Sequence, residues 1–212
     1  NSIAITLPAT IIPISIALLA AYAFAWMEFR GRNILFVLVF ALQIVPIQMA
    51  LIPLLQLFSG GQIFGVPVIV GIGQAGYAQV WIAHTIFALP LAIFLLHNFI
   101  SEIPGEVIEA ARVDGAGHGQ IFLRIVLPLA MPAIASFGIF QFLWVWNDLL
   151  VALVFSTGQP DTAPLTQRLA ELAGSRGEDW ERLTAGAFVS LVVPLLVFFG
   201  LQRFFVRGLL AG

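Results

Sequence analysis

The stretch from Asn33 to Phe58 reads NILFVLVFALQIVPIQMALIPLLQLF and contains no Asp, Glu, Lys or Arg. About 20 mostly apolar residues in a helix cross the roughly 30 Å of hydrocarbon in a bilayer. The stretch without these four residues extends to Ser101 and is long enough for two crossings. The segment Ser59–Gly76, which contains Gly and Pro, divides it. We therefore expect membrane-spanning helices at Ile34–Phe58 and Ala78–Phe99.

Three further apolar segments have the length of a crossing. They are Ile3–Met27, Ile125 to about Phe155, and Leu183–Phe205. The second contains Pro128 and Pro132 and is long for one straight crossing. The chain is 60% hydrophobic and only 9% charged, whereas soluble domains carry about 25% charged residues. We predict an all-α polytopic transmembrane bundle with five spans, forming a single domain over residues 1–212.

Composition excludes several classes of function. The net charge of −2 gives no basic surface for nucleic acid, and the absence of cysteine removes disulfides and thiolate chemistry. All nine basic residues are arginine, so a phosphate-binding G-x-x-x-x-G-K-[ST] loop is impossible in this chain. If nucleotide energy drives a process here, another chain binds the nucleotide. His84 and His97 lack metal-ligand spacing, and we expect no metal site.

Arginine placement predicts the orientation, because cytoplasmic loops of membrane proteins carry an excess of basic residues. If the turn with Arg30 and Arg32 is cytoplasmic, successive spans cross in opposite directions. Residues 101–124 and the C-terminus then lie inside, and residues 156–182 lie outside. A short helix is expected in the outer loop from Pro164 to Gly174, either contacting a partner or covering the bundle. The inner arginines are Arg30, Arg32, Arg112, Arg124, Arg203 and Arg207, and the outer ones are Arg168, Arg176 and Arg182.

The inner loop Ser101–Arg124 reads SEIPGEVIEAARVDGAGHGQIFLR and is too polar to span a membrane. A short helix is predicted from Pro104 up to the Asp114-Gly115 break, with Val107, Ile108 and Ala111 as its apolar stripe. Two interpretations remain, a docking helix for another protein or a helix lying on lipid. Interfacial helices usually carry Lys or Arg on their polar face, whereas this one carries mainly acidic residues. Glu106 and Glu109 supply charge for pairing across an interface.

The same loop resembles the EAA loop of permease subunits from binding-protein-dependent ABC importers. The family pattern is EAA, three residues, Gly, nine residues, Ile, one residue and Leu-Pro. The run Asp114-Gly115-Ala116 and the stretch WNDLLVAL at 146–153 are similar to the carbohydrate-importing, maltose- or glucoside-type branch. Such permeases usually have six spans, so we expect one further span before Asn1. The matching positions are Glu109, Ala110, Ala111, Gly115, Ile125, Leu127 and Pro128.

The resemblance implies a non-catalytic translocation subunit in a bacterial or archaeal cytoplasmic (inner) membrane. It implies a dimer of ATP-binding subunits that holds ATP and Mg, a second homologous permease, an extracytoplasmic solute-binding protein, a carbohydrate substrate and lipid contact. This chain would need no cofactor, and no nucleic acid is expected. The ATPase-coupling residues that it implies are Glu109, Ala110, Ala111, Asp114, Gly115, Ala116, Leu127 and Pro128.

Polar residues inside the apolar segments are either interhelical hydrogen-bonding groups or solute contacts. As pathway candidates we take Gln43, Gln141, Trp144 and Asn147. Trp144 and Trp146 have two open interpretations, sugar-stacking rings or membrane-interface anchors. Asp148 is expected to be hydrated and structural. The full polar set is Gln43, Gln48, Gln56, His84, His97, Asn98, Gln141, Asn147 and Asp148.

Two other classes of function are weaker on the residues alone. An ion-coupled secondary transporter needs ionisable groups at mid-membrane, and only Asp148 comes near that. An intramembrane enzyme would need a recognisable catalytic motif, and the chain has neither H-E-x-x-H nor G-x-S-x-G.

Overall fold

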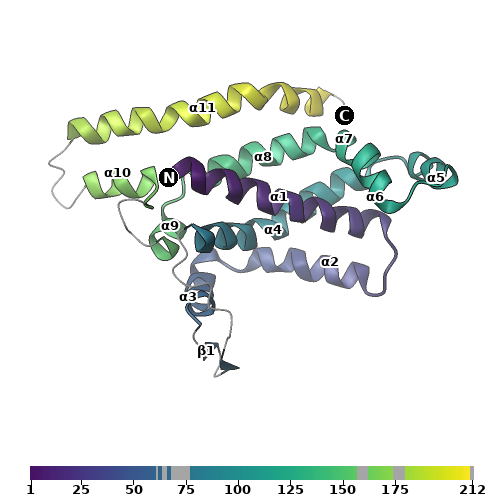
Figure 1. Cartoon of the computed structure of the whole chain (residues 1–212), viewed down its shortest axis with the longest axis horizontal. Helices are drawn as coiled ribbons and strands as arrows, with labels where there is room; N and C mark the ends of the chain where they lie inside the picture. Colours follow the sequence, from purple (N-terminus) through teal and green to yellow (C-terminus); the bar gives the residue numbers. More distant parts are fainter. Residues whose placement is uncertain (61, 64–65, 68–76, 157–161, 174–179, 211–212) are drawn as a thin grey trace.

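Long helices form the architecture of this chain, as its apolar segments predict. The computed structural model describes residues 1–60, 62–63, 66–67, 77–156, 162–173 and 180–210. Three helices within these ranges are long and apolar enough to cross a membrane, and counting each of two bent pairs as one span raises the number to five. The three are α1 (Ser2–Trp26), α4 (Ala78–Ser101) and α11 (Trp180–Leu210); α1 packs against α4, and α11 lies along one side of the bundle (Figure 1).

The first bent pair replaces the straight span expected at Ile34–Phe58. Helix α2 (Arg32–Ala41) continues through the 3-10 turn η1 (Leu42–Ile44) and then meets α3 (Ile47–Phe58) at an angle of 105°. Pro46 stands at the break with an extended backbone. Proline has no N–H for the helix and pushes the residue before it out of the helical region, so the chain turns there.

The second bent pair replaces the single long span expected from Ile125 to Phe155. Its first half contains α6 (His118–Ile121), the π-helical turn η2 (Phe122–Val126) and α7 (Leu127–Leu129). Its second half is α8 (Met131–Trp146), inclined by 69° to the first, and α9 (Leu150–Phe155) follows as a separate short helix. Pro128 and Pro132 flank the bend at Ala130 and supply no N–H to the helical ladder.

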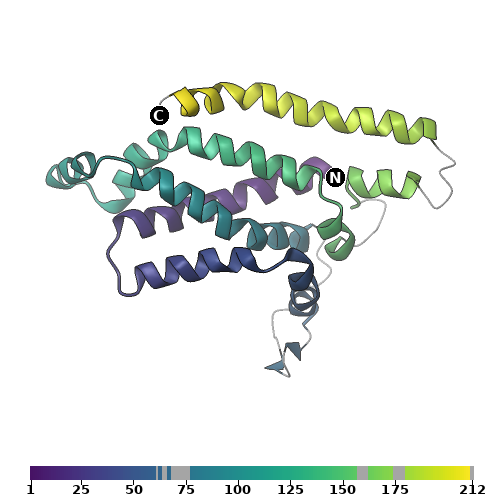
Figure 2. The ribbon, with the colours of Figure 1, turned by 180° about the vertical axis from the view of Figure 1, so that it is seen from behind.

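Two short helices mark opposite ends of the bundle (Figures 1 and 2). The predicted inner-loop helix is confirmed as α5 (Gly105–Val113), and the outer-loop helix as α10 (Leu165–Ala173). We call the end that carries α5 the coupling end. Near the other end, β1 (Gln62–Ile63) and β2 (Val66–Pro67) form a small antiparallel pair in the segment expected to divide two spans. The rest of that divider (61, 64–65, 68–76), Gly174 and Arg176 lie outside the described residues.

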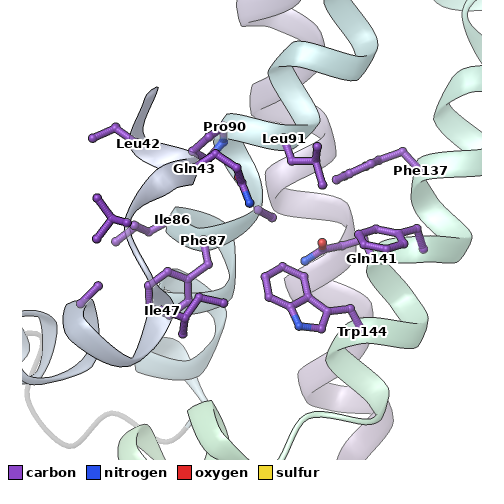
Figure 3. Close-up of a pocket in the computed structure, with 14 residues that line it drawn as sticks. Leu42, Gln43, Ile47, Ile86, Phe87, Pro90, Leu91, Phe137, Gln141 and Trp144 are labelled. Carbon is purple, nitrogen blue, oxygen red and sulfur yellow. The ribbon is translucent and has the colours of Figure 1, made fainter. Parts of the chain in front are cut away.

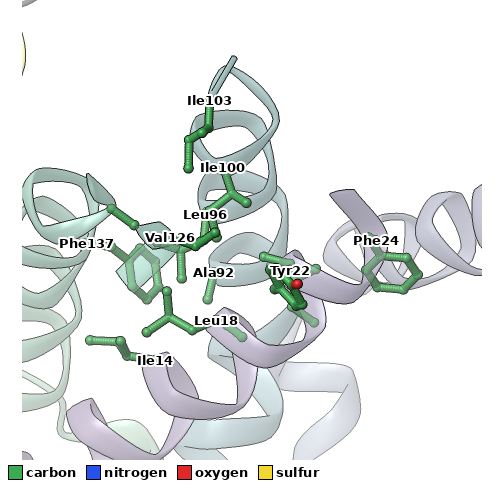
Figure 4. Close-up of a cluster of buried hydrophobic side chains, with 14 of the residues drawn as sticks. Ile14, Leu18, Tyr22, Phe24, Ala92, Leu96, Ile100, Ile103, Val126 and Phe137 are labelled. Carbon is green, nitrogen blue, oxygen red and sulfur yellow. The ribbon is translucent and has the colours of Figure 1, made fainter. Parts of the chain in front are cut away.

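The core is built around the close packing of α1 against α4. Small side chains let the two backbones approach, and Ala17, Ala21, Ala83 and Ala92 have no exposed surface. At the coupling end the two helices join α8 and η2 in a buried apolar cluster (Figure 4). A second cluster at the other end joins α1, α3, α4, α8 and α9. Its buried members are Ile5, Ala9, Leu51, Leu54, Phe58, Val80, Ala83, Val145, Val151 and Phe155.

Three prolines inside two spans, α1 and α11, explain three interhelical hydrogen bonds. A helical proline leaves the carbonyl four residues earlier without its usual donor. In membrane helices such carbonyls need another partner, and here each of three receives one from a neighbouring helix. Pro8, Pro13 and Pro194 free the carbonyls of Ala4, Ala9 and Ser190, which accept from Trp81 Nε1 at 3.0 Å, Gln141 Nε2 at 3.2 Å and Trp146 Nε1 at 3.0 Å.

Candidate coupling helix and solute cavity

One buried side chain fastens α5 to the bundle. Ile108 is fully buried and belongs to the coupling-end cluster, together with Leu96 and Ile100 of α4 and Ile121 and Val126 of the following segments. Of the apolar stripe predicted for this helix, Ala111 is half-buried against the same cluster, whereas Val107 remains 40% exposed. The helix therefore rests on the bundle along a narrow line and turns most of its surface outward.

The end of α5 is capped by the Asp114-Gly115 pair that the sequence marks as a break. Gly115 has φ of +83°, in the left-handed region. Its N–H donates to the carbonyl of Arg112 at 3.0 Å, and the N–H of Ala116 donates to the carbonyl of Ala111 at 2.9 Å. These two bonds form a Schellman motif, which needs a residue that tolerates the left-handed conformation. The predicted turn at Gly115 is thus a closed helix cap.

Two hydrogen bonds tie the coupling loop to the end of α1. The guanidinium of Arg112 donates through Nη2 to the carbonyl of Trp26 at 3.1 Å. The Tyr22 hydroxyl and Nδ1 of His118 are 2.8 Å apart. Trp26 Nε1 in turn donates to the carbonyl of Ile100 at 3.2 Å, which joins α1 to α4. A displacement of α5 therefore acts on α1 and α4 together.

The outward face of α5 carries the residues at the centre of the predicted coupling motif. Glu109 and Ala110 are exposed, and so are Glu106 and Asp114. Val113 is 88% exposed, which is unusual for an apolar side chain on a helix that is otherwise well anchored. Within the described residues, none of these three carboxylates has a basic side chain within ion-pair distance. The surface combines unpaired acidic charge with a small apolar patch.

The remaining predicted coupling residues occupy other positions. Ala116 follows the cap and is half-buried against the coupling-end cluster. Leu127 and Pro128 belong to α7, at the start of the bent span, where Leu127 packs on that cluster and Pro128 is exposed. Leu127 and Pro128 therefore lie in the bent span that follows the loop and are not on the outward face of α5.

A cavity of about 320 Å³ lies between the η1 break, α4 and α8. Three of the four predicted pathway residues line it, and the side chains of Gln43, Gln141 and Trp144 point toward one another (Figure 3). The fourth, Asn147, does not line the cavity and instead donates from Nδ2 to the carbonyl of Leu143 at 2.8 Å. Apolar side chains form the rest of the wall, among them Phe87, Leu91, Phe137 and Phe140.

Of the two polar atoms of the Gln141 side chain, one is hydrogen-bonded and the other is not. Its Nε2 is the donor to the carbonyl that Pro13 frees on α1, which fixes the orientation of the amide. Its Oε1 is buried and has no hydrogen-bond partner among the described residues. A buried acceptor without a donor costs about 1–3 kcal/mol. The interpretation of Gln141 as an interhelical hydrogen-bonding group is confirmed by its bond to α1, and its solute role stays a prediction.

Sequence reasoning missed the partner of Asp148. The side chain of Asp148 is only 11% exposed, so the expectation of a hydrated carboxylate is wrong, and its Oδ2 lies 3.6 Å from Nε2 of the fully buried His84. The two residues are distant in sequence, so no local spacing connects them. The only signal was that both are ionisable residues inside apolar segments.

The two tryptophans that had shared two open interpretations have different environments. Trp144 lines the cavity, and its ring lies edge-on to His84 with centroids 5.9 Å apart. Trp146 is buried, stacks on Phe142 and donates to the carbonyl of Ser190 in α11. Trp146 is therefore a packing residue between two helices, and Trp144 is the one that lines the cavity.

Two known bacterial permease proteins are similar to this chain in sequence. The chain is 58% identical over 213 residues to the osmoprotective compounds uptake permease protein of Synechocystis, covering 100% of this chain and 68% of that protein. It is 57% identical over 213 residues to the alpha-glucoside transport system permease protein of Rhizobium meliloti, covering 100% of this chain and 54% of that protein. The chain thus spans about half to two thirds of the length of these relatives.

Solved structures share the fold. A bacterial alginate ABC transporter in complex with an alginate pentasaccharide-bound periplasmic protein matches with a TM-score of 0.75 at 17% identity, over 96% of this chain and 75% of that chain. An inward-facing methionine ABC transporter matches with a TM-score of 0.71 at 18% identity, over 97% of this chain and 92% of that chain. The family model described as "Binding-protein-dependent transport system inner membrane component" matches residues 6–210. By that match, which covers nearly the whole sequence, the chain belongs to the family of inner membrane components of binding-protein-dependent transport systems.

Proposed function

We propose that this chain is a membrane-spanning permease subunit of an ATP-driven importer for sugars or related hydroxyl-rich solutes. It forms one half of an alternating-access pathway and catalyses no reaction itself. A separate pair of ATP-binding subunits holds ATP and Mg. The observation that carries this proposal is the outward face of α5, where Glu109 and Ala110 stand exposed on a helix whose opposite side is anchored through Ile108.

The construction of the coupling end suits the transfer of force. A docking surface passes on motion only if its base does not yield. The base of α5 has a buried anchor, a closed C-terminal cap and a hydrogen bond from Arg112 to the end of α1. The description of the family names a binding protein, and the solved structures that share the fold are ABC transporters. We infer that a basic group of the ATPase pairs with Glu109.

The proposed cargo class follows from the cavity and the relatives. Two amide side chains and one indole line an otherwise apolar cavity, a combination that suits a ring with hydroxyls at its edge and C–H groups on its face. Relatives are described as permeases for alpha-glucosides, osmoprotective compounds and, at 35% identity in Mycobacterium tuberculosis, trehalose. An importer of alpha-glucosides and similar osmoprotective solutes is the most specific function that these names support.

The proposed assembly places α5 and the C-terminus in the cytoplasm. Arg30, Arg32, Arg112 and Arg124 belong to segments at the coupling end, whereas Arg168 lies on α10 at the other end (Figure 1). The positive-inside rule then orients the coupling end toward the cytoplasm. Helix α2 has no buried residue, and neither does the membrane-length part of α11. These faces are available to lipid and to the second, homologous permease, and the opposite end is available to a solute-binding protein.

Removal of the Glu109 carboxylate tests the coupling role. Truncating one partner of a desolvated interfacial charge pair costs about 2–5 kcal/mol, so Glu109→Ala should release the ATPase subunits or let them hydrolyse ATP without uptake. Glu28→Ala is the control, because Glu28 is also an exposed acid but lies between α1 and α2 and not on α5. Co-purification of the ATPase and uptake per ATP hydrolysed in proteoliposomes are the measurements. Normal coupling in Glu109→Ala would remove the assignment of this residue.

The cargo class is tested separately with radiolabelled trehalose, sucrose and maltose. Uptake by the assembled transporter should require ATP and persist when ion gradients are collapsed. Uptake that needs an ion gradient and ignores ATP would instead favour a secondary transporter. If the transporter takes up none of the three disaccharides, the alpha-glucoside assignment is wrong, whereas the coupling role of α5 is unaffected.

A further inference from the structure

A buried ionisable pair connects four helices at the end opposite α5. Nε2 of His84, on α4, lies 3.6 Å from Oδ2 of Asp148, in the turn between α8 and α9. The side chain of His84 is 1% exposed and that of Asp148 is 11% exposed. Burying two ionisable groups is costly unless geometry and hydrogen bonds compensate. The contacts of each partner therefore indicate what the pair does.

Asp148 organises the turn that follows α8. Its Oδ1 accepts from the N–H of Val151 at 3.3 Å, and its Oδ2 accepts from the N–H of Ala152 at 3.1 Å, so the carboxylate closes the first turn of α9. Its backbone carbonyl accepts from the Thr166 hydroxyl at 2.7 Å, which attaches α10. The carboxylate is therefore fixed by two hydrogen bonds and the backbone of Asp148 by a third, none of which involves His84, so Asp148 provides a stationary support for the imidazole.

The imidazole of His84 lies between this support and the solute cavity. One nitrogen faces Asp148, and the ring meets Trp144 edge-on, with an interplanar angle of 86°. His84 itself does not line the cavity, whereas Trp144 does. The void beside the pair, between Thr6, Val80 and Pro164, is only about 10 Å³, roughly the space that one water requires. No solute reaches His84 there, so its influence on a solute passes through Trp144.

We propose that His84 is a positioning residue for the solute cavity: supported by Asp148 on one side, its ring holds the indole of Trp144 in the orientation in which it faces Gln141. This inference rests on the proposed function, because it assigns Trp144 to the solute cavity. It also explains why an ionisable pair is placed where an apolar pair would pack at less cost. Asp148 holds α9 through its carboxylate and α10 through its backbone carbonyl, so the wall of the cavity is tied to the end of the bundle.

A metal site is the main competing explanation for a buried His–Asp pair. A metal ion in proteins takes at least three or four ligands. Across the described ranges, His84 and Asp148 are not part of any group of three His, Cys, Asp or Glu side chains. The nearest ring to His84 is the indole of Trp144, which is not a metal ligand. The arrangement therefore favours support of a side chain over coordination of an ion.

The orientation of Trp144 is tested directly by ¹⁹F NMR of the assembled transporter containing 5-fluorotryptophan. Trp144→Phe assigns the resonance by its loss. His84→Gln and Asp148→Asn should each shift or broaden that resonance, because both remove part of the support. His97→Gln is the matched control, since it changes the same residue type on the same helix without contact to Trp144. An unmoved resonance in both test variants, or an equal change in His97→Gln, overturns the proposal.

Uptake of the radiolabelled disaccharides separates this inference from the proposed function. Trp144→Phe and His84→Gln should each lower maximal uptake by about three- to tenfold, the factor of one oriented aromatic contact. The double variant should be no worse than Trp144→Phe alone. Multiplied losses would overturn the positioning role and keep the cavity as the solute site. Unchanged uptake in Trp144→Phe would overturn the solute role of the cavity, whereas the NMR result still decides whether His84 orients the indole.

Discussion

The cap of the coupling helix allows a substitution whose cost is almost purely conformational. Gly115 has φ of +83°, and a Cβ built on it meets nothing within 4 Å. Gly115→Ala therefore adds no steric clash and removes no side-chain contact. It only forces an L-residue into the left-handed region, which costs about 1–2 kcal/mol. That free energy corresponds to a factor of about 5–30 in the population of the closed cap.

Amide hydrogen exchange measures this factor where the structure places it. The N–H groups of residue 115 and Ala116 donate to the carbonyls of Arg112 and Ala111, so these amides exchange only when the cap opens. In Gly115→Ala, their exchange, corrected for intrinsic rates, should accelerate by about 5–30-fold. Uptake per ATP should fall in parallel, because α5 then loses its fixed end.

Two further variants test whether the left-handed conformation at residue 115 causes the effect. Gly115→Asn should restore much of the protection, because asparagine visits the left-handed region more readily than alanine. Gly119→Ala is the control, since a Cβ there also meets nothing within 4 Å and the residue lies inside α6, where its φ is not positive. Unchanged protection in Gly115→Ala, or an equal loss in Gly119→Ala, would show that the left-handed cap does not hold the coupling helix.

Other predictions concern the anchor of α5 and the freed carbonyl on α1. Ile108→Ala should weaken the docking of α5 by about 2–5 kcal/mol, and Val113→Ala, at 88% exposure, by less than about 0.5 kcal/mol; limited proteolysis within the loop compares them, and similar sensitivity would contradict the anchoring role. Gln141→Leu should lower thermal stability, because it leaves the Ala9 carbonyl without a donor. In a Pro13→Ala background the backbone N–H of residue 13 supplies that donor, so the destabilisation by Gln141→Leu should shrink by about 1–3 kcal/mol. If the two substitutions are simply additive in a double-mutant cycle, this explanation of the Gln141 hydrogen bond is wrong.

The positions of prolines were visible in the sequence, but their consequences were not. Pro46 interrupts an apolar run that by length alone predicts one straight span, and the structure bends by 105° there. Pro8 and Pro13 lie within a helix that remains continuous. In α1, Trp81 and Gln141 donate to the carbonyls that these prolines free. That information is tertiary, because the donors come from helices remote in sequence.

The candidate sites divide in the same way. The coupling helix, its acidic face and its stop at Gly115 follow from local patterns, because helix periodicity and a left-handed cap are properties of adjacent residues. The cavity was predicted only in part. Gln43, Gln141 and Trp144 meet around it, whereas Asn147 forms a hydrogen bond to its own helix. Composition identified the polar candidates but gave no helix orientation that would separate those facing the cavity from the others.

From its sequence by itself, this protein is a helical membrane protein with an exposed acidic helix at one end and no means to bind a nucleotide through a lysine-containing phosphate loop. Those properties depend on the lengths of apolar segments, on residue types and on short-range spacing, all of which are present in the chain before it folds. Tertiary structure alone decided that His84 faces Asp148, that Arg112 bonds to the end of α1, and where the cavity between η1, α4 and α8 lies. Each of these depends on the rotation and closeness of helices far apart in sequence, and those are set by packing of the whole bundle.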